Sequence, residues 1–598
     1  MIEAAKQKSR GKQLAMMLVV VAVLSVKESA ADVPGDAVRR PNILVIMTDD
    51  QGWGDLSGNG NVNLKTPNIE GLAKQGAVLE RFYVCPVCSP TRAEFLTGRY
   101  HWRSGVFSTS SGGERMNPEE RTIAEAFQAA GYRTAAFGKW HNGTQAPYHP
   151  NSRGFDEFYG FCSGHWGTYW NPMLERNGEP VTGEGFITDD LTSQAIAFIE
   201  RDEERPFFVY VPYNTPHSPM QVPNQWWDRF KDKELQIKNR EPEKEDIQHI
   251  RAALAMCENI DWNVGRLMDS LRSTGKEENT IVIYFSDNGP NGVRWNGDMK
   301  GRKGSTDEGG VRSPGIIRWP AVIQASTRVT DNVSVTDLYP TLTAMAGIQV
   351  KHVRPLDGVD QSAVIREGKT GSDRMIISHW NRRVSVKWKE FRLDNEGQLF
   401  DLSNDPGQRK PVNEKYPEVV NRLQQEQAVA RAEIQAAPRS EQQPYPIGYS
   451  AQPTWLPARD AHVTGDIRRS NRFPNSSYFE NWVNQKDTIY WETDVKQAGV
   501  YEVELFYGCS KGQEGSEFVL TGGGGKLKFA LEKSFPTEII GTPYDRVPRA
   551  ESEEKAWGRM NIGRIKLKSG VTEMTLQCSK LSKQQAMEFR MLIFRKQD

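Results

Sequence analysis

In the stretch NILVIMTDDQG, residues 42–52, five consecutive apolar residues are followed by one threonine and then by a pair of carboxylates. The same arrangement recurs where FFVYV at 207–211 leads into Pro-Tyr-Asn and where IVIYF at 281–285 leads into Ser-Asp-Asn-Gly. Strands that are apolar throughout are buried on both faces, as in a sheet covered by helices on each side. Open α/β sheets place their functional sites at the carboxyl ends of such strands. The sequence therefore predicts an α/β domain over residues 41–350, with its site among these polar residues.

The pattern of the chain changes beyond residue 350. Residues 351–437, with a helix predicted to begin near Pro417, are expected to form a smaller C-terminal subdomain of the same unit. Residues 438–453 are rich in Pro, Gln and Ser, which predicts a linker. Strands with period-two alternation follow, joined by hairpin turns, and they predict an all-β sandwich over residues 454–598.

The N-terminus has the composition of a secretory signal. A basic region precedes the apolar run at 14–24, and Ser29-Ala30-Ala31 fits a cleavage site, so residues 1–31 are predicted to be a signal peptide. An uncleaved signal anchor is the alternative. We expect a secreted or periplasmic protein that is not held in the membrane after cleavage. Lys plus Arg and Asp plus Glu both number 76, so net charge gives no reason to expect nucleic-acid binding.

The cysteines are too few for a disulfide scaffold in a chain of 598 residues. Cys85 and Cys88 form one C-x-x-C, and the second pair that a zinc site would need is missing from the sequence. Cys509 and Cys578 can pair in an oxidising compartment, and the sequence leaves that pairing open.

Oxygen ligands follow two of the predicted strands. Asp49, Asp50 and Asp287 offer carboxylates, and Asn288 offers an amide oxygen. Such a set suits a hard cation, and calcium tolerates irregular geometry better than magnesium does. Any one of these aspartates, taken singly, is more often a strand-end cap or a surface carboxylate than a metal ligand. Three of them together would repel one another without a cation, which favours a calcium site.

Cys88-Ser-Pro-Thr-Arg92, followed by Leu96-Thr-Gly-Arg99, resembles the signature of the type I sulfatases. A buried structural cysteine before a proline turn is the alternative for this motif alone. Further segments of the family occur in the same order across residues 41–435. They are NILVIMTDDQG at 42–52, GKWH at 138–141, TPHSP at 215–219, SDNG at 286–289, GRKG at 301–304 with EGGVR at 308–312, and LFDLSNDP at 399–406. Thr91 stands where Ser is also common in the family.

The resemblance implies an alkaline-phosphatase-like α/β fold and the hydrolysis of sulfate esters. It implies that a formylglycine-generating enzyme oxidises Cys88 to an aldehyde, formylglycine. The calcium ligands it implies are Asp49, Asp50, residue 88, Asp287 and Asn288. The catalytic residues it implies are Cys88, Arg92, Lys139, His141, His217 and Lys303. A lone lysine, arginine or histidine is more often a surface charge or a structural group, but each of these lies inside a matched segment.

The implied mechanism assigns a role to each histidine. The aldehyde hydrates to a gem-diol, and one hydroxyl attacks sulfur with help from calcium and Asp287. His217 and Lys303 assist the departing alcohol. The second hydroxyl, assisted by His141, then expels sulfate and restores the aldehyde. A serine or cysteine has no second hydroxyl and would trap the sulfated intermediate.

The substrate and the role of the sandwich are less constrained by the sequence. The secretion signal and the appended domain favour a sulfated sugar or polysaccharide as substrate. The sandwich resembles galactose-binding-like carbohydrate modules, with a ligand-free structural domain as the alternative. Side chains that can line sugar sites are Trp482, Trp491 and Trp557 in the sandwich, and His165, Trp166 and Trp170 in the loop 161–171. For any single tryptophan of the sandwich, packing in the core is the commoner role. Rival functions are a formylglycine-dependent phosphodiester or phosphonate-ester hydrolase and a non-catalytic carbohydrate-binding protein.

Overall fold

The computed structural model describes residues 40–369 and 371–597, so the predicted signal peptide, residues 1–31, lies outside the described residues. Residues from Arg40 onward form one compact unit. In the described ranges, no helix is long and apolar enough to span a membrane. All six cysteines are buried free thiols, so the structure does not pair Cys509 with Cys578.

The centre of the unit is an eleven-stranded mixed sheet with the order β11-β2-β10-β8-β1-β7-β3-β4-β5-β6, and β9 pairs with β2. The strands are β1 (Asn42–Thr48), β2 (Ala77–Tyr83), β3 (Arg133–Lys139), β4 (Glu157–Phe161), β5 (Met173–Arg176), β6 (Glu179–Thr182), β7 (Phe207–Pro212), β8 (Thr280–Ser286), β9 (Arg312–Ser313), β10 (Gly315–Arg318) and β11 (Thr327–Ser334). The central strand β1 runs parallel to both β7 and β8. The three apolar runs of the sequence are therefore neighbours in space.

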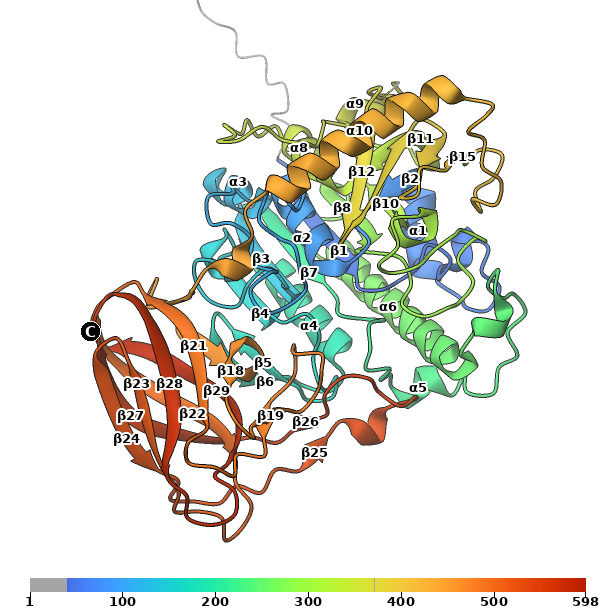
Figure 1. Cartoon of the computed structure of the whole chain (residues 1–598). Helices are drawn as coiled ribbons and strands as arrows, with labels where there is room; N and C mark the ends of the chain where they lie inside the picture. Colours follow the sequence, from blue (N-terminus) through green and yellow to red (C-terminus); the bar gives the residue numbers. More distant parts are fainter. Residues whose placement is uncertain (1–39, 370, 598) are drawn as a thin grey trace, which may run out of the picture. The chain divides into compact units, whose positions relative to one another are not determined.

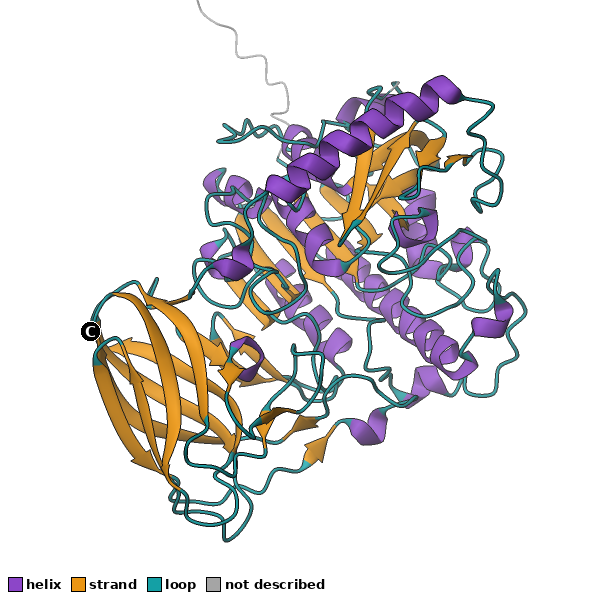
Figure 2. Ribbon diagram, viewed as in Figure 1, coloured by secondary structure: helices purple, strands orange, loops and turns teal. Residues whose placement is uncertain are grey.

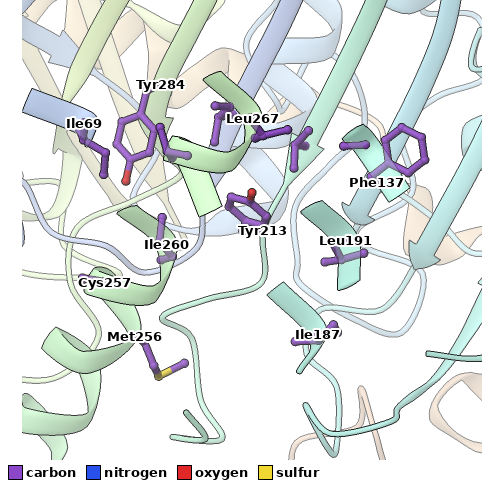
Figure 3. Packing of buried hydrophobic residues seen from close by; sticks show 14 of the residues in the cluster. Ile69, Phe137, Ile187, Leu191, Tyr213, Met256, Cys257, Ile260, Leu267 and Tyr284 are labelled. Carbon is purple, nitrogen blue, oxygen red and sulfur yellow. The ribbon is translucent and has the colours of Figure 1, made fainter. Parts of the chain in front are cut away.

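Helices cover both faces of this sheet (Figures 1 and 2). On one face, Leu44 and Ile46 pack with α1 (Pro67–Gln75), α4 (Ile187–Ile199) and α6 (Ile247–Ser273). Figure 3 shows part of this core, including Leu191 from α4 and Leu267 from α6.

On the other face, Ile43, Val45 and Met47 pack with α2 (Cys88–Thr97), α3 (Ile123–Ala129), α8 (Leu338–Met345) and α9 (Ser362–Glu367). Alternate residues of β1 thus bury on opposite faces, as the continuous apolar pattern predicts. The predicted α/β class is confirmed.

A four-stranded antiparallel sheet follows, made of β12 (Met375–Trp380), β13 (Arg383–Trp388), β14 (Phe391–Leu393) and β15 (Leu399–Asp401). The long helix α10 (Pro417–Ala436) packs on it through Val420 and Leu423, and it begins at the proline that the sequence marks. Two further short helices are α5 (Asn224–Trp227) and α7 (Glu308–Val311).

Two antiparallel-rich sheets form the C-terminal sandwich (Figure 2). One contains β16 (Tyr445–Ile447), β18 (His462–Val463), β21 (Thr488–Val495), β23 (Glu517–Gly522), β24 (Gly525–Ala530) and β28 (Gly570–Lys580). The other contains β17 (Thr454–Pro457), β19 (Arg468–Arg469), β20 (Phe479–Glu480), β22 (Gly499–Gly508), β27 (Gly558–Leu567) and β29 (Glu588–Gln597). A short pair, β25 (Ile539–Ile540) with β26 (Glu554–Lys555), lies beside them.

The segment predicted as a linker, residues 438–453, is part of the packed structure. Strand β16 pairs with β21, which extends the sandwich back to Tyr445. The guanidinium of Arg115 lies 4.5 Å from the ring centroid of Tyr445 and donates hydrogen bonds to the carbonyls of Ser440 and Gln443. Composition suggested a solvated connection, but the contacts are those of a docked segment, so the linker prediction is wrong.

The three tryptophans considered as sugar platforms mainly pack inside. Trp482 and Trp491 belong to the sandwich core, at 1% and 0% exposure. Trp557 is half-buried against Tyr478 and a small apolar cluster. Burial of Trp482 and Trp491 rules out stacking on a sugar, so for these two the commoner role of a tryptophan, core packing, is confirmed. That the sandwich binds carbohydrate elsewhere stays a prediction.

Candidate active site

The carboxylates lie where β1 and β8 end side by side. The parallel register pairs Thr48 with Ser286, so the residues that follow each strand meet at one edge of the sheet. The backbone amide of Asp50 donates to Asp287 Oδ1 at 3.2 Å. Asp50 has a φ of 66°, and this left-handed turn changes the direction of the chain directly after Asp49. Asp49, Asp50, Asp287 and Asn288 are all fully buried.

Cys88 is the first residue of α2, a helix whose ten residues are all buried. Thr91 fixes this helix to the sheet, because its Oγ1 donates to the carbonyl of Asp287 at 2.6 Å and accepts from the amide of Cys85 at 2.9 Å. Ligand atoms of Cys88, Asp49 and Asp287 lie within 4.8 Å of one another. The predicted nucleophile thus stands against the predicted metal ligands.

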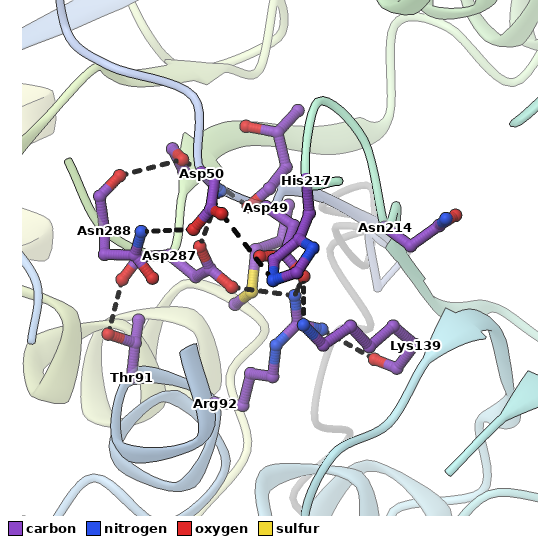
Figure 4. A network of polar contacts seen from close by, with 12 residues as sticks. Asp49, Asp50, Thr91, Arg92, Lys139, Asn214, His217, Asp287 and Asn288 are labelled. Atoms are coloured by element: carbon purple, nitrogen blue, oxygen red, sulfur yellow. Dashed lines mark hydrogen bonds and ion pairs between the residues drawn. The ribbon is translucent and has the colours of Figure 1, made fainter. Parts of the chain in front are cut away.

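Three cationic side chains form ion pairs with the carboxylates, and Figure 4 shows two of them, Arg92 and Lys139. Arg92 Nη2 donates to Asp287 Oδ2 at 2.8 Å and to Asp49 Oδ2 at 3.3 Å. The ammonium of Lys139 pairs with Asp49, and its backbone carbonyl accepts from Arg92 Nη1 at 2.6 Å. Lys303 Nζ lies 2.7 Å from an oxygen of Asp50. We call these three with the carboxylates, Cys88 and Asn288 the catalytic cluster.

Burial shapes the protonation of this cluster. Burial, together with the charge of Asp49, raises the pKa of Asp287 to about 7. Burial acts in the same direction on Asp50, but the ammonium of Lys303 outweighs it and holds that pKa below its usual range. Burial also raises the pKa of the Cys88 thiol, against the opposing charge of Lys139. An unmodified thiol here is therefore a weak nucleophile at neutral pH.

The oxygens of the catalytic cluster fit a calcium ion. Asp49 Oδ1 and Asn288 Oδ1 are buried atoms with no hydrogen-bond partner among the described residues. Buried polar atoms without partners are rare and call for an explanation. Hard oxygen donors of this kind, next to Asp50 and Asp287, are the ligands that calcium takes. Asp49, Asp50, Asp287 and Asn288 would hold the ion.

His217 lies at the edge of the catalytic cluster. Its Nδ1 donates to the carbonyl of Ser218 at 2.6 Å, and its Nε2 lies 3.7 Å from Asp50 Oδ2. The hydroxyl of Tyr169 supports this loop by donating to the carbonyls of His217 and Ser218. Because Nδ1 is committed to the backbone, Nε2 is the nitrogen available for chemistry.

His141 follows β3 and Lys139 and has a φ of 63°. Its Nε2 donates to the carbonyl of Thr109 at 2.9 Å. Its Nδ1 is buried and lacks a hydrogen-bond partner in the described part of the chain. Burial, with the charge of Lys139, keeps the pKa of His141 well below its ordinary value. A neutral imidazole with a free Nδ1 can accept a proton.

Some residues of the site were only partly anticipated from the sequence. In the loop 161–171, His165 stacks against His217 with ring centroids 6.0 Å apart, whereas Trp166 packs into the core and Trp170 stacks on Tyr544. Asn214, drawn in Figure 4, was not predicted, and both its amide atoms are buried without partners among the described residues. Its place two residues after the end of β7, and three residues before His217, is the signal that points to it.

Comparison with known proteins agrees with this geometry. The sulfatase family model matches residues 41–348, about half of the chain. N-acetylgalactosamine-6-sulfatase of Canis lupus familiaris is 30% identical over 461 residues, which cover 65% of this chain and 84% of that protein.

Solved structures extend the comparison. The crystal structure of Ps i-CgsB in complex with k-i-k-neocarrahexaose shares 29% identity at a TM-score of 0.62, over 67% of this chain and 95% of that chain. Phosphonate monoester hydrolase of Agrobacterium radiobacter shares 20% identity at a TM-score of 0.51, over 66% of this chain and 96% of that one, and this likeness concerns the fold alone. With its catalytic cluster assembled where β1 and β8 end, the chain belongs to the sulfatase family and is a sulfuric ester hydrolase.

Proposed function

We propose that this sulfatase removes sulfate from a sulfated sugar, using formylglycine at position 88 and a bound calcium ion. The observation that carries the proposal is the contact of Cys88 with buried carboxylates that Arg92, Lys139 and Lys303 surround. A sulfate ester is an anion and resists attack by a nucleophile unless its charge is neutralised. A buried cluster of fixed cations provides that neutralisation without reorganising during the reaction.

Each group of the catalytic cluster then has one task. Calcium, when bound, neutralises the carboxylates and polarises the sulfate, and the hydrated aldehyde provides two hydroxyls on one carbon. Arg92 holds Asp49 and Asp287 in place through its Nη2. Lys139 and Lys303 bring positive charge to the region where sulfate oxygens would lie. Asp287, whose carboxylate lies within 4.8 Å of the Cys88 sulfur, is placed to accept the proton of the attacking hydroxyl.

The two histidines serve different halves of the reaction. His217 Nε2 and the ammonium of Lys303 both adjoin Asp50 and assist the departing alcohol. His141 is two residues after Lys139 in the sequence. Its free Nδ1 accepts the proton of the second hydroxyl as sulfate leaves. That transfer restores the aldehyde without a further reactant.

The names of related proteins support a sugar substrate. One relative is an N-acetylgalactosamine-6-sulfatase, and one related structure contains a neocarrahexaose. The basic and apolar composition of residues 1–31 supports secretion, where sulfated polysaccharides would be met. We therefore place the enzyme outside the cytoplasm, in the medium or the periplasm.

Mass analysis of the peptide 82–92 tests the modification. This tryptic peptide contains both Cys85 and Cys88, so Cys85 serves as an internal control. We expect residue 88 to have lost its sulfur in favour of an aldehyde or its hydrate, with Cys85 intact. Cys88→Ala should fold normally but show no turnover, whereas Cys85→Ala should remain active. Full activity with an unmodified Cys88 would overturn the mechanism.

A substrate panel tests the reaction class. The panel contains defined sulfated saccharides, 4-nitrophenyl sulfate and bis(4-nitrophenyl) phosphate. We expect kcat/KM to be highest for one sulfated saccharide. Faster turnover of the phosphate diester would favour the rival phosphodiesterase, and absence of turnover of every ester would favour a non-catalytic protein.

A further inference from the structure

Two segments of the C-terminal sandwich reach the catalytic histidines. The first contains Arg459 and Asn475, which are 3% and 7% exposed. Arg459 Nη1 donates to Ser163 Oγ at 2.8 Å and to Asn475 Oδ1 at 3.3 Å, and its Nη2 lies 3.0 Å from Glu114 Oε1. Glu114 and Ser163 belong to the sulfatase domain. The sandwich is thus joined to that domain by a buried polar network.

Asn475 extends this network to His141. Its Nδ2 donates to the carbonyl of Thr109 at 3.3 Å, and the same carbonyl accepts from His141 Nε2 at 2.9 Å. A carbonyl oxygen has two lone pairs, so it can accept both hydrogen bonds at once. Asn475 therefore fixes the acceptor that determines which nitrogen of His141 carries the proton.

The close approach of Asn475 to His141 depends on Gly164. A Cβ atom added to Gly164 would lie 2.5 Å from both Asn475 Nδ2 and His141 Nε2. Only a residue without a side chain leaves these two groups free to share one carbonyl. Ser163, the neighbour of Gly164, holds Asn475 from the other side by donating to its backbone carbonyl at 2.8 Å.

A second segment of the sandwich supports the other histidine. The hydroxyl of Ser218, next to His217, donates to the carboxylate of Glu551. Arg549 Nη1 donates to the carbonyl of Gly167 at 2.6 Å. The sandwich therefore contacts the catalytic face at two places rather than at one.

We propose that Asn475 is a positioning residue for His141, and hence that the C-terminal sandwich completes the active site of the sulfatase. The proposal rests on the proposed function, because it concerns the step in which His141 accepts a proton. With Nε2–H held by the carbonyl of Thr109, the lone pair of His141 stays on Nδ1. Without Asn475, one of the two hydrogen bonds that fix the Thr109 carbonyl is lost, so this carbonyl can move away from Nε2 and the other tautomer of His141 becomes accessible. The free base would then be on the wrong nitrogen.

Steady-state kinetics with 4-nitrophenyl sulfate test the proposal. In the two-step mechanism, kcat/KM reports the steps up to loss of nitrophenolate, whereas kcat also includes release of sulfate. Asn475→Ala should therefore lower kcat by about 10- to 100-fold and lower KM by the same factor. A pre-steady-state burst of about one equivalent of nitrophenolate should appear. Asn475→Asp, which has no N–H donor in its side chain, should behave in the same way.

Matched variants separate a positioning role from a structural one. Asn561→Ala is the control, because Asn561 is an asparagine of the sandwich whose amide donates to Glu502, a contact between β27 and β22 that does not involve the sulfatase domain. Its kcat and KM should equal those of the parent. His141→Ala should give the same kinetic split as Asn475→Ala, and the double variant should add little beyond His141→Ala.

The possible failures are distinguishable. A parent enzyme that releases no nitrophenolate contradicts the proposed function itself. If His141→Ala shows the split but Asn475→Ala keeps the kcat of the parent, the proposal for Asn475 is wrong. It is also wrong if Asn475→Ala lowers kcat while KM is unchanged and no burst appears, because that pattern means a smaller fraction of folded enzyme.

Discussion

Replacing Arg459 by methionine should destabilise the whole protein. Arg459, Glu114 and Asp460 have side chains 3%, 1% and 1% exposed, and the guanidinium contacts both carboxylates. Burial raises the pKa of Glu114, and the charge of Arg459 opposes that rise. Methionine preserves much of the volume, so packing is largely kept. The variant is then left with two buried carboxylates and no cation between them.

The expected cost follows from that loss. Removing one partner of a buried ion pair typically costs about 3–5 kcal/mol, because the remaining charge is uncompensated. The folded-state pKa of Glu114 lies above its unfolded value and rises further in the variant, so its stabilising contribution is present at low pH and is lost as pH rises. The deficit should therefore be largest near about pH 8 and smaller near about pH 5.5.

Urea unfolding at both pH values, followed by tryptophan fluorescence, measures the free energy of unfolding. The double variant Arg459→Met/Glu114→Gln should recover about 1–3 kcal/mol, because one buried charge is gone. A deficit below about 1 kcal/mol near pH 8 would show that the network contributes little. A deficit that grows toward acid pH would refute the assignment of the unpaired charge to Glu114.

Three further predictions concern the chemistry and the core. His217→Ala should lower sugar-sulfate turnover by about 10²–10⁴-fold and aryl-sulfate turnover much less, whereas Asp49→Ala should lower both alike. If His217→Ala lowers the turnover of aryl sulfates of graded leaving-group pKa by one common factor, a leaving-group role for His217 is excluded. Burial raises the pKa of Glu94 from 4.5 to about 8. The Tm of the parent should therefore fall as pH rises between those two values, whereas the Tm of Glu94→Gln should not, and parallel Tm profiles of the two proteins would contradict this. Chelation should lower both activity and Tm, and calcium should restore them better than magnesium.

Much of the fold could be predicted because its strongest signals are local. The run at 43–47 is apolar at every position, and the structure buries alternate residues on opposite faces of the sheet. The parallel register of β1 and β8 then brings Asp49 and Asp287 together, which follows from the position of each aspartate after its strand. Family segments added the cations, and the structure places Arg92, Lys139 and Lys303 around these carboxylates.

The part that could not be predicted depends on contacts between distant residues. The hydrogen bond from Asn475 to Thr109 joins residues 366 positions apart, and neither lies in a recognisable motif. The composition of residues 438–453 predicted a linker, because Pro, Gln and Ser are typical of such segments. The structure instead buries Tyr445 and Ile447 in a sandwich sheet. The position of a tryptophan in a β-domain likewise does not say whether its ring faces the core or the solvent.

The burial of α2 also constrains the timing of biosynthesis. Cys88 is 2% exposed, and every residue of α2 is buried, so a modifying enzyme could reach this segment only before it packs. Asn475, which lies beside His141, leaves the ribosome 387 residues after Cys88. At about 5–20 residues per second, this delay is about 20–75 s. Since the last residues around His141 arrive only then, the length of the chain itself sets an interval during which the nascent protein can be oxidised before its active site closes.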